Sequence, residues 1–503
     1  MVADKFPKCP TGIDGLDDIL CGGLPAHRLY MVQGDPGVGK TTLALRYLLK
    51  GIELGEQGLY ITLSETKEEL LEVAHSHGWS LDKLAIFELS AIEKQLLEQS
   101  QNTLFHPSEV ELNHTTKLLL AEVEKTKPAR VVFDSLSEMR LLAETALRYR
   151  RQMLSLKQFF AGRKSTVLLL DDRTSGEGDL QVQSIAHGVI AMEKNALDYG
   201  VERRRLQVVK VRGVKFRGGY HDFSIEQGGL KVFPRLVAAE HHKTFKRESV
   251  SSGIQQLDDL LGGGLDRGTS NLFIGPAGTG KSTLTMQFAT VLAGQGERVV
   301  IFSFDENLGT LVTRAQSIGM DVETHLKSGK ICIQQVDPAE LSPGEFAYRI
   351  RTAVQKENAR MIVIDSLNGY MNAMPDERFL SIQLHELLTF LSQQGVMTIM
   401  TVAQHGLMGS SMTSPVDLTY LADTVVVLRY FEATGSVKKA ISAIKKRSGH
   451  HEDTIREYQI TSKGIHVGEP LRDFQGVLTG VPHLFVKTDQ LLKTHAGSGP
   501  KLS

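Results

Sequence analysis

Residues 34–41 read Gly34-Asp35-Pro36-Gly37-Val38-Gly39-Lys40-Thr41, and residues 275–282 read Gly275-Pro276-Ala277-Gly278-Thr279-Gly280-Lys281-Ser282. Each stretch has the spacing G-x-x-x-x-G-K-[ST] and lies between a short apolar run and a helical pattern. Glycines let the backbone curl so that successive amide N–H groups point inward at phosphate oxygens, and the following helix adds its positive N-terminal end. The sequence therefore predicts two nucleotide-binding loops, whose ATP contacts extend to Thr42 and Thr283.

Side chains in and near these loops complete two predicted Mg²⁺–ATP sites. The lysine of each loop, Lys40 or Lys281, is expected to reach the β- and γ-phosphates and to act in catalysis. A hydroxyl of the loop and an aspartate that ends a continuous apolar strand are expected to form the Mg²⁺ site. These predicted metal-site residues are Thr41 and Asp134 in the first copy, and Ser282 and Asp365 in the second. ATP and Mg²⁺ are thus the expected cofactors.

The loops belong to a longer internal repeat. Residues 11–24 are echoed nearly position for position by residues 252–265, and the strand at residues 129–136 is echoed at 359–367. Predicted strands and helices alternate in the same order in both copies, which is typical of βαβ units around a parallel sheet. The predicted fold is α/β, with two tandem P-loop domains, each a mostly parallel sheet flanked by helices. We place them at residues 1–240 and 241–480, followed by a flexible tail at 481–503.

Acidic residues follow the second predicted strand of each copy. Glu65 follows the strand at residues 58–63, and Asp305 and Glu306 follow the strand at 298–304. Carboxyl ends of parallel strands meet at the edge where ligands bind, so Glu65 and Glu306 are candidate catalytic bases, with Asp305 as a helper. The alternative is that these acids cap the next helix, because residues 65–69 also read as a first helical turn.

Composition limits the class of protein. The chain has 503 residues, with 57 Lys plus Arg against 58 Asp plus Glu, so it has no overall positive field that would attract nucleic acid or anionic lipid. The 3 cysteines lack the spacing of a zinc or redox motif, which indicates a reducing compartment. No apolar run is long enough to cross a bilayer. We therefore expect a cytoplasmic protein without a membrane partner.

The order of loop, Glu-ended strand and Asp-ended strand makes each copy resemble a RecA-type ATPase core. The Gly-Ile…Leu-Asp…Gly-Gly-Leu lead-in before both loops, together with the closing basic segments at residues 210–213 and 445–457, resembles the KaiC family of circadian clock ATPases and autokinases. This resemblance implies a double-ringed homo-hexamer with ATP between subunits, hydrolysis in the first domain and Ser/Thr autophosphorylation in the second. It also implies a KaiB-like protein partner.

The resemblance assigns further residues. Those implied to contact the ATP of a neighbouring subunit are Lys210, Arg212, Lys445 and Arg447, as an arginine finger would. Thr419 occupies the position of a phosphoacceptor, with Tyr420 at the adjacent acceptor position. The chain departs from the family pattern at Tyr420. It also has Ser64-Glu65 and Asp305-Glu306 where the family has adjacent glutamates in both copies, and Ser448-Gly449 inverts an expected Gly-Ser. These differences indicate a divergent KaiC-like protein.

Two other functions fit parts of the sequence. The basic run at residues 203–217 is compatible with a nucleic-acid groove of a RecA-like, nucleic-acid-dependent ATPase. Its alternation of charged and apolar residues fits an edge strand equally well, and near-zero net charge favours a strand that carries phosphate-facing cations. The remaining alternative is a nucleotide-gated scaffold with negligible turnover. We therefore do not expect nucleic acid as a partner.

Overall fold

The computed structural model describes residues 7–89, 107–172, 183–197, 199–372, 380–404, 419–433, 435–478 and 483–484. The chain forms two compact units, Met1–Arg235 and Leu236–Ser503. Their division lies close to the boundary expected after residue 240. The last predicted segment, 481–503, contains one described strand, β24 (His483–Leu484), which pairs with β23 (Phe474–Gln475). The rest of that segment lies outside the described residues.

The first unit contains the elements β1 (Lys8–Cys9), α1 (Asp14–Ile19), β2 (Leu24–Pro25), β3 (Leu29–Gly34), α2 (Lys40–Glu53), β4 (Gly58–Thr62), α3 (Lys67–Ser76), β5 (Ala85–Glu88), α5 (Pro107–Thr126), β6 (Arg130–Asp134), α6 (Leu136–Ala143), α7 (Ala146–Phe160), β7 (Thr166–Asp172), β8 (Gly188–Asn195), β9 (Arg203–Val211), β10 (Tyr220–Glu226) and β11 (Gly229–Phe233).

The second unit contains η1 (Ala238–Glu240), β12 (Ser249–Val250), α9 (Gln255–Leu260), β13 (Leu265–Asp266), β14 (Ser270–Gly275), α10 (Lys281–Gly294), β15 (Arg298–Ser303), α11 (Leu308–Ser317), α12 (Val322–Lys327), β16 (Ile331–Gln335), α13 (Pro343–Gln355), β17 (Ala359–Asp365), α14 (Leu367–Asn372), α15 (Leu380–Gln393), β18 (Met397–Ala403), β19 (Thr424–Ala433), β20 (Ser436–Lys446), β21 (Ile455–Thr461) and β22 (Gly464–Pro470), before β23 and β24.

The two units share one sheet topology. The first sheet has the order β11-β10-β9-β8-β3-β7-β6-β4-β5, and the second has β22-β21-β20-β19-β14-β18-β17-β15-β16. In each, the strands from β8 or β19 through β5 or β16 are parallel, and the other three extend the sheet in an antiparallel manner. The predicted tandem α/β fold is confirmed.

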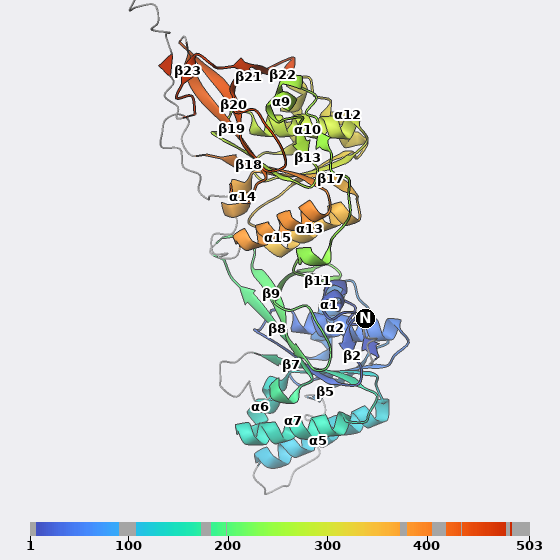
Figure 1. The fold of residues 1–503 in the computed structure, drawn as a ribbon. Coiled ribbons are helices and arrows are strands. Elements are labelled where there is room, and N and C mark those ends of the chain that lie inside the picture. Colours follow the sequence, from blue (N-terminus) through green and yellow to red (C-terminus); the bar gives the residue numbers. More distant parts are fainter. Residues whose placement is uncertain are drawn as a thin grey trace, which may run out of the picture. The chain divides into compact units, whose positions relative to one another are not determined.

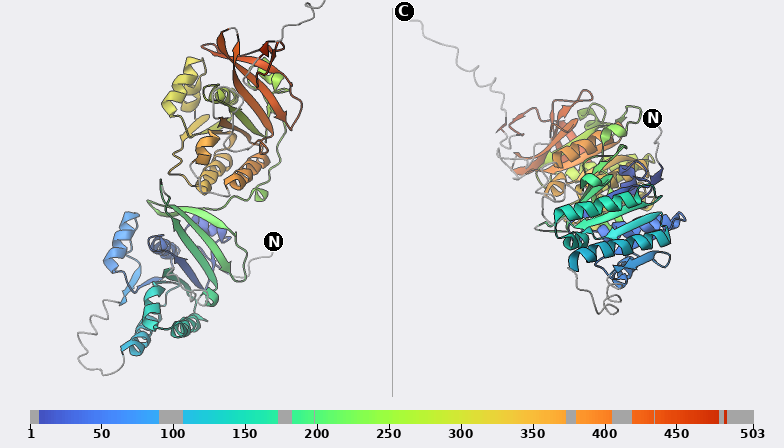
Figure 2. Two further views of the ribbon diagram at one scale, coloured as in Figure 1. Left: turned by 90° about the vertical axis from the view of Figure 1, so that its left-hand side faces the viewer. Right: turned by 90° about the horizontal axis from the view of Figure 1, so that it is seen from below.

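Helices cover both faces of each sheet (Figures 1 and 2). In the first unit, α1, α2 and α3 contribute to one buried apolar cluster, and α5, α6 and α7 contribute to another. In the second unit, α9 to α12 and α13 to α15 divide in the same way. Parallel strands covered on both faces read as continuous apolar runs, which is why their positions were predictable. Each unit thus has its own core.

The basic run at residues 203–217 departs from its predicted position. Its strand β9 pairs with both β8 and β10, so it lies inside the sheet rather than at an edge. The charges are accommodated by neighbouring strands, because Arg205 forms an ion pair with Glu193 at 2.9 Å and lies 4.2 Å from the centre of the Tyr220 ring. The alternation of charged and apolar residues cannot distinguish an edge strand from an interior one, because an antiparallel strand with one solvent-exposed face shows the same pattern.

In the described part of the chain, no helix combines the length and apolar character that crossing a membrane requires.

Candidate functional site

Each phosphate loop connects a central strand to a helix. The first follows β3 and leads into α2, and the second follows β14 and leads into α10. Lys40 Nζ donates to the carbonyl oxygens of Gly34 and Asp35 at 2.8 and 3.0 Å. Lys281 Nζ donates in the same way to Gly275 and Pro276 at 2.8 and 2.9 Å. Both ammonium groups are therefore held within their own loops, at the place where phosphate oxygens would bind.

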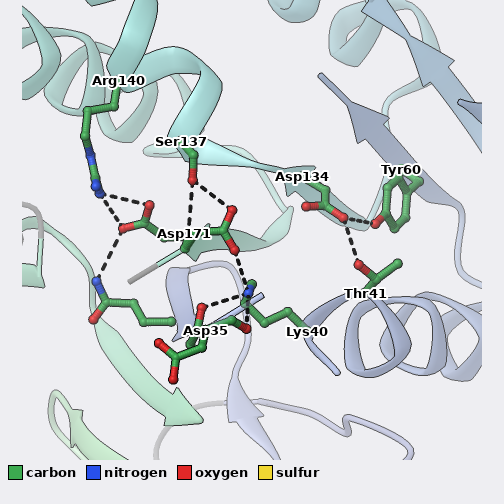
Figure 3. A network of polar contacts seen from close by, with 11 residues as sticks. Asp35, Lys40, Thr41, Tyr60, Asp134, Ser137, Arg140 and Asp171 are labelled. Carbon is green, nitrogen blue, oxygen red and sulfur yellow. Dashed lines mark hydrogen bonds and ion pairs between the residues drawn. The ribbon is translucent and has the colours of Figure 1, made fainter. Parts of the chain in front are cut away.

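The first loop is joined to the end of β6 (Figure 3). Thr41 Oγ1 donates to Asp134 Oδ2 at 3.2 Å, and the hydroxyl of the buried Tyr60 donates to the same oxygen. Burial raises the pKa of Asp134, while the two hydrogen bonds oppose this shift. The predicted pairing of a loop hydroxyl with a strand-end carboxylate is thus present. Tyr60 was not predicted, because a tyrosine within an apolar strand gives no separate signal.

The second loop has a related arrangement. Asp365 ends β17, as Asp134 ends β6, and its carboxylate accepts a hydrogen bond from Thr401 of β18. Ile301 stands in β15 where β4 has Tyr60. The supporting hydrogen bond therefore comes from β4 for Asp134 and from β18 for Asp365. In both copies these hydroxyl and carboxylate groups are of the type that Mg²⁺ prefers.

Glu65 lies at the carboxyl end of β4, where the Thr62 hydroxyl donates to the Glu65 carbonyl at 2.6 Å. Its Oε2 atom is buried and has no hydrogen-bond partner among the described residues. Burial and the nearby Asp134 carboxylate raise the pKa of Glu65 to about 7, with smaller contributions from Glu69 and Asp172. A carboxyl group with this pKa can accept a proton near neutral pH.

Glu306 occupies the equivalent turn, since the Ser303 hydroxyl donates to its carbonyl oxygen at 2.7 Å. Unlike Glu65, it forms an ion pair with Arg314 of α11, at 2.9 Å between Oε2 and Nη2. Burial raises the pKa of Glu306, and Arg314 opposes this shift. Asp305, the predicted helper, is exposed and accepts a hydrogen bond from Ser366. Arg314 was not predicted, because it lies within the following helix, outside the strand-end segment that contains Glu306.

Neither glutamate caps the helix that follows it. Thr66 is the N-cap of α3 and forms a capping box with Glu69, and Asn307 caps α11 by accepting a hydrogen bond from Thr310 N at 2.9 Å. Capping is therefore performed by the next residue in each copy. Glu65 and Glu306 thus lie just after the carboxyl ends of β4 and β15, without capping the next helix.

A second acidic pair lies beside the first loop. Asp171 and Asp172 end β7, and Asp172 forms an ion pair with Lys40 at 2.7 Å. Asp171 is fully buried and accepts two hydrogen bonds from Arg140 at 2.7 and 2.9 Å. We did not predict these contacts. The signal was present, because two acids follow a buried strand at the edge that carries the loop.

The cations expected to act on a neighbouring ATP lie toward the opposite ends of the central strands. Arg212 N donates to His187 O, and His187 N donates to Leu29 O at the start of β3. Arg447 is joined to Ser270 through Asp423 in the same way. Lys210 and Lys445 precede them by two residues and pair with Val189 and Val425. The structure thus separates these cations from the phosphate loops that follow the other ends of β3 and β14.

Thr419 lies near the second pair of cations. Lys445 Nζ donates to Thr419 O at 2.8 Å and to Ala422 O at 2.7 Å, and Arg447 Nη2 donates to Tyr420 O at 3.1 Å. The segment at 407–424 that contains Thr419 is only partly described, because residues 405–418 lie outside the described residues.

These residues fit an Mg²⁺–ATP complex. Each loop has an ammonium group already satisfied by loop carbonyls, a hydroxyl next to it, and a strand-end aspartate. Gly39 and Gly280 adopt φ angles of 108° and 103°, which favour glycine and turn the loop into its helix. The nucleotide would supply the phosphoryl group, and the chain supplies the cations, the metal ligands and the carboxylates around it.

The comparison with protein families matches both copies. A family model described as "ATPase: KaiC" matches residues 9–237 and again residues 250–472. The chain belongs to the KaiC ATPase family. Each KaiC match contains a phosphate loop, its candidate glutamate and the aspartate that ends β6 or β17, so the family assignment covers both candidate sites.

Curated KaiC proteins are similar over almost the whole chain. The circadian clock oscillator protein KaiC of Parathermosynechococcus lividus is 28% identical over 487 residues, covering 95% of this chain and 88% of the relative. Its counterpart from Synechococcus elongatus is 27% identical over 483 residues, covering 94% and 92%. That from Thermosynechococcus vestitus is 28% identical over 486 residues, covering 95% and 92%. The chain is therefore a divergent KaiC-like protein with duplicated domains.

Proposed function

We propose that the first domain hydrolyses ATP, with Glu65 as the general base that activates water. The supporting observation is the buried Glu65 Oε2, which has no hydrogen-bond partner among the described residues and belongs to a carboxyl with a pKa of about 7. Lys40 stabilises charge on the transferring phosphoryl group, and Thr41 and Asp134 hold Mg²⁺. Glu65 takes a proton from the attacking water.

Glu65→Gln tests this proposal. The amide keeps the shape of the side chain but cannot accept the proton, so phosphate release should fall about 10²- to 10³-fold. ATP affinity should change little, since Lys40 and the loop remain. The measurement is phosphate release in a Lys281→Ala background, with Glu68→Gln as a matched control on an exposed position. Unchanged turnover in Glu65→Gln would exclude Glu65 as the base.

We further propose that the second domain autophosphorylates Thr419, with Glu306 as base and Asp305 as helper. Thr419 is held by Lys445 near the amino end of β14, whereas Glu306 lies beyond the carboxyl end of β15. Because β14 runs from Ser270 to Gly275, these ends are separated by roughly 17 Å. This separation supports transfer between neighbouring copies rather than within one domain.

Incubation with γ-labelled ATP tests the kinase proposal. We expect covalent label that is lost in Thr419→Ala and in Glu306→Gln. A mixture of these two variants should regain label, since each copy supplies what the other lacks. Label on Glu306→Gln alone at the parent rate, or no label on the parent, would overturn the proposal. Released phosphate without covalent label would leave an ATPase.

The assembly we propose is a homo-hexamer of two rings, in which Lys210, Arg212, Lys445 and Arg447 contact the ATP of a neighbour. Its support is the position of these cations away from the loops of their own domains. Mass photometry with and without Mg²⁺–ATP measures the assembly. A KaiB-like protein is the proposed partner, which a pull-down in the presence of ATP tests. ATPase assays with added DNA test the competing nucleic-acid function, for which no stimulation is expected.

A further inference from the structure

The phosphate loops of the two domains differ in one neighbouring side chain. In the first domain, the Asp172 carboxylate forms an ion pair with Lys40 at 2.7 Å and accepts a hydrogen bond from Ser137 at 3.1 Å. Lys40 is only 7% exposed, and the Asp172 side chain is 28% exposed. The ammonium group that should bind phosphate oxygens is thus already paired with a carboxylate.

The second domain lacks this carboxylate. Gly34 pairs with Asp172 in the first sheet, and Gly275 pairs with Ala403 in the second. The supporting contact agrees with this equivalence, because Ser137 Oγ accepts from Asp172 N and Asn368 Oδ1 accepts from Ala403 N. Ala403 therefore stands where the first domain has Asp172. Lys281 has its loop carbonyls as hydrogen-bond partners, and no ion pair involving Lys281 is found among the described residues.

The position of Asp172 is fixed by the chain around it. The preceding residue, Asp171, is buried and bound by Arg140, and Gln33 Nε2 also donates to it at 3.4 Å. These contacts anchor the end of β7 beside β3. Ser137 then holds the Asp172 carboxylate from the other side. Asp172 is a built part of the site rather than a freely rotating surface acid.

An anion that enters the first loop must compete with Asp172 for Lys40. When Lys40 turns to the phosphates, Asp172 is left without its cation next to a group of the same sign, and repulsion adds to the cost. The competent form of the site is then only a fraction of the free population, and the apparent dissociation constant rises by the inverse of that fraction. The cost is greatest for a ligand with a γ-phosphate.

We propose that Asp172 sets the nucleotide affinity of the first domain by competing with the β- and γ-phosphates of ATP for Lys40. The second domain, with Ala403, has no such competitor. This competitor is therefore a difference between the two ATP sites of one chain that lies in a single side chain. This inference rests on the proposed binding of ATP by the first domain.

Isothermal titration calorimetry on the full chain, with Mg²⁺ and either ATP or ADP, tests the proposal. In a Lys281→Ala background, Asp172→Ala and Asp172→Asn should bind ATP about tenfold more tightly than the parent, and ADP with a smaller gain. Asp172→Asn keeps a hydrogen-bonding group for Ser137 and so separates charge from packing. The gain should shrink as salt is added, because part of the interaction is screened.

The reciprocal change uses the other domain. In a Lys40→Ala background, Ala403→Asp should weaken ATP binding by a similar factor, while Ala403→Ser should not. Equal or weaker ATP binding by both Asp172 variants would overturn the proposal and leave ATP binding intact. Absence of ATP binding in the Lys281→Ala parent and in both variants would overturn the first-domain site itself. ATP binding only after Asp172 is replaced would support an especially strong competitor.

Discussion

The ionisation of Glu65 sets the pH dependence expected of the first domain. Its pKa is raised to about 7, so the carboxylate form that accepts a proton predominates above pH 7. Below this value the protonated form accumulates and kcat/KM should fall about tenfold per pH unit, because kcat/KM reports the free enzyme. Phosphate release by the Lys281→Ala variant, measured from pH 5.5 to about 9, checks this profile. A profile with its midpoint near the usual glutamate value would contradict it.

Arg314 should restrain the base of the second domain. Arg314→Val removes the ion pair with Glu306 and copies Val73, which stands at the corresponding position of α3. Since Arg314 lowers the pKa of Glu306, its loss should move the midpoint of label incorporation to higher pH. Above that midpoint the rate should rise about two- to fivefold, the size expected for a partly exposed ion pair.

Val73→Arg is the matched change in the first domain. It should lower the rate of phosphate release and shift its pH midpoint downward, since a cation favours the carboxylate of Glu65. Arg314→Lys should behave like the parent second domain. If Arg314→Val slows label incorporation at every pH, Arg314 instead helps to position Glu306 for the reaction.

The site residues fall into two groups. The roles of some follow from their own position in the sequence, and the roles of others follow from contacts between distant elements. Lys40, Thr41, Asp134 and Glu65 were predictable because each stands at a strand end or within the loop spacing. The partners of these groups come from other elements, such as Tyr60 in β4 or Arg314 in α11. Their importance depends on strand order and side-chain direction, which one-dimensional spacing does not carry. Asp172 is intermediate, since its position at a strand end was visible but its lysine partner was not.

At the scale of elements, the turn from loop to helix depends on one glycine in each copy. Gly280 has a φ of 103°, and a Cβ placed there would lie 2.5 Å from both Tyr458 Oη and Ile460 Cδ1. Gly280→Ala should therefore distort the loop and weaken ATP binding at least about tenfold, the equivalent of ~1.4 kcal/mol. Calorimetry in a Lys40→Ala background measures it.

Gly294→Ala is the control for that change. Gly294 ends α10, the helix that begins at the loop, and a Cβ there meets no atom within 4 Å. ATP affinity should be unchanged in this variant. Gly39→Ala in the first domain, where the Cβ would lie 2.7 Å from Ile225 Cδ1, should repeat the loss. Normal affinity in both loop variants would show that the backbone tolerates the change.

Elements of the parallel sheet were easier to predict than those beside it. Buried strands such as β14 and β17 are continuous apolar runs between turns, so their positions follow from sequence alone. The antiparallel strands β9 and β20 mix charged and apolar residues, and that pattern fits an edge and an interior position equally well. Strand pairing, which depends on contacts distant in sequence, decided between them.

At the scale of the whole molecule, two separate cores predict two thermal transitions. Each unit has its own pair of buried clusters on the two faces of its sheet. A ligand that binds one folded unit at 100 times its dissociation constant stabilises that unit by about 2.7 kcal/mol. Calorimetric scans with Mg²⁺–ATP should show both transitions move upward. Lys40→Ala should abolish the shift of one transition, and Lys281→Ala that of the other.

A single transition that responds to both lysine variants would show that the units unfold as one. The duplication itself was readable from the sequence, because the two copies repeat the same motifs in the same order. The boundary could be placed only approximately, since the connecting residues carry no periodic pattern.

In each domain, the phosphate loop and the basic residues lie toward opposite ends of one central strand. Every domain therefore has two different ends. If the basic end of one copy joins the loop end of the next, an open row leaves one unjoined end of each kind. A closed ring leaves neither. Closing the ring would then complete the last ATP site between two copies without any new type of contact. A defect in the basic residues of one copy would then remove activity at the phosphate loop of its neighbour, although the neighbour's own chain is unaltered.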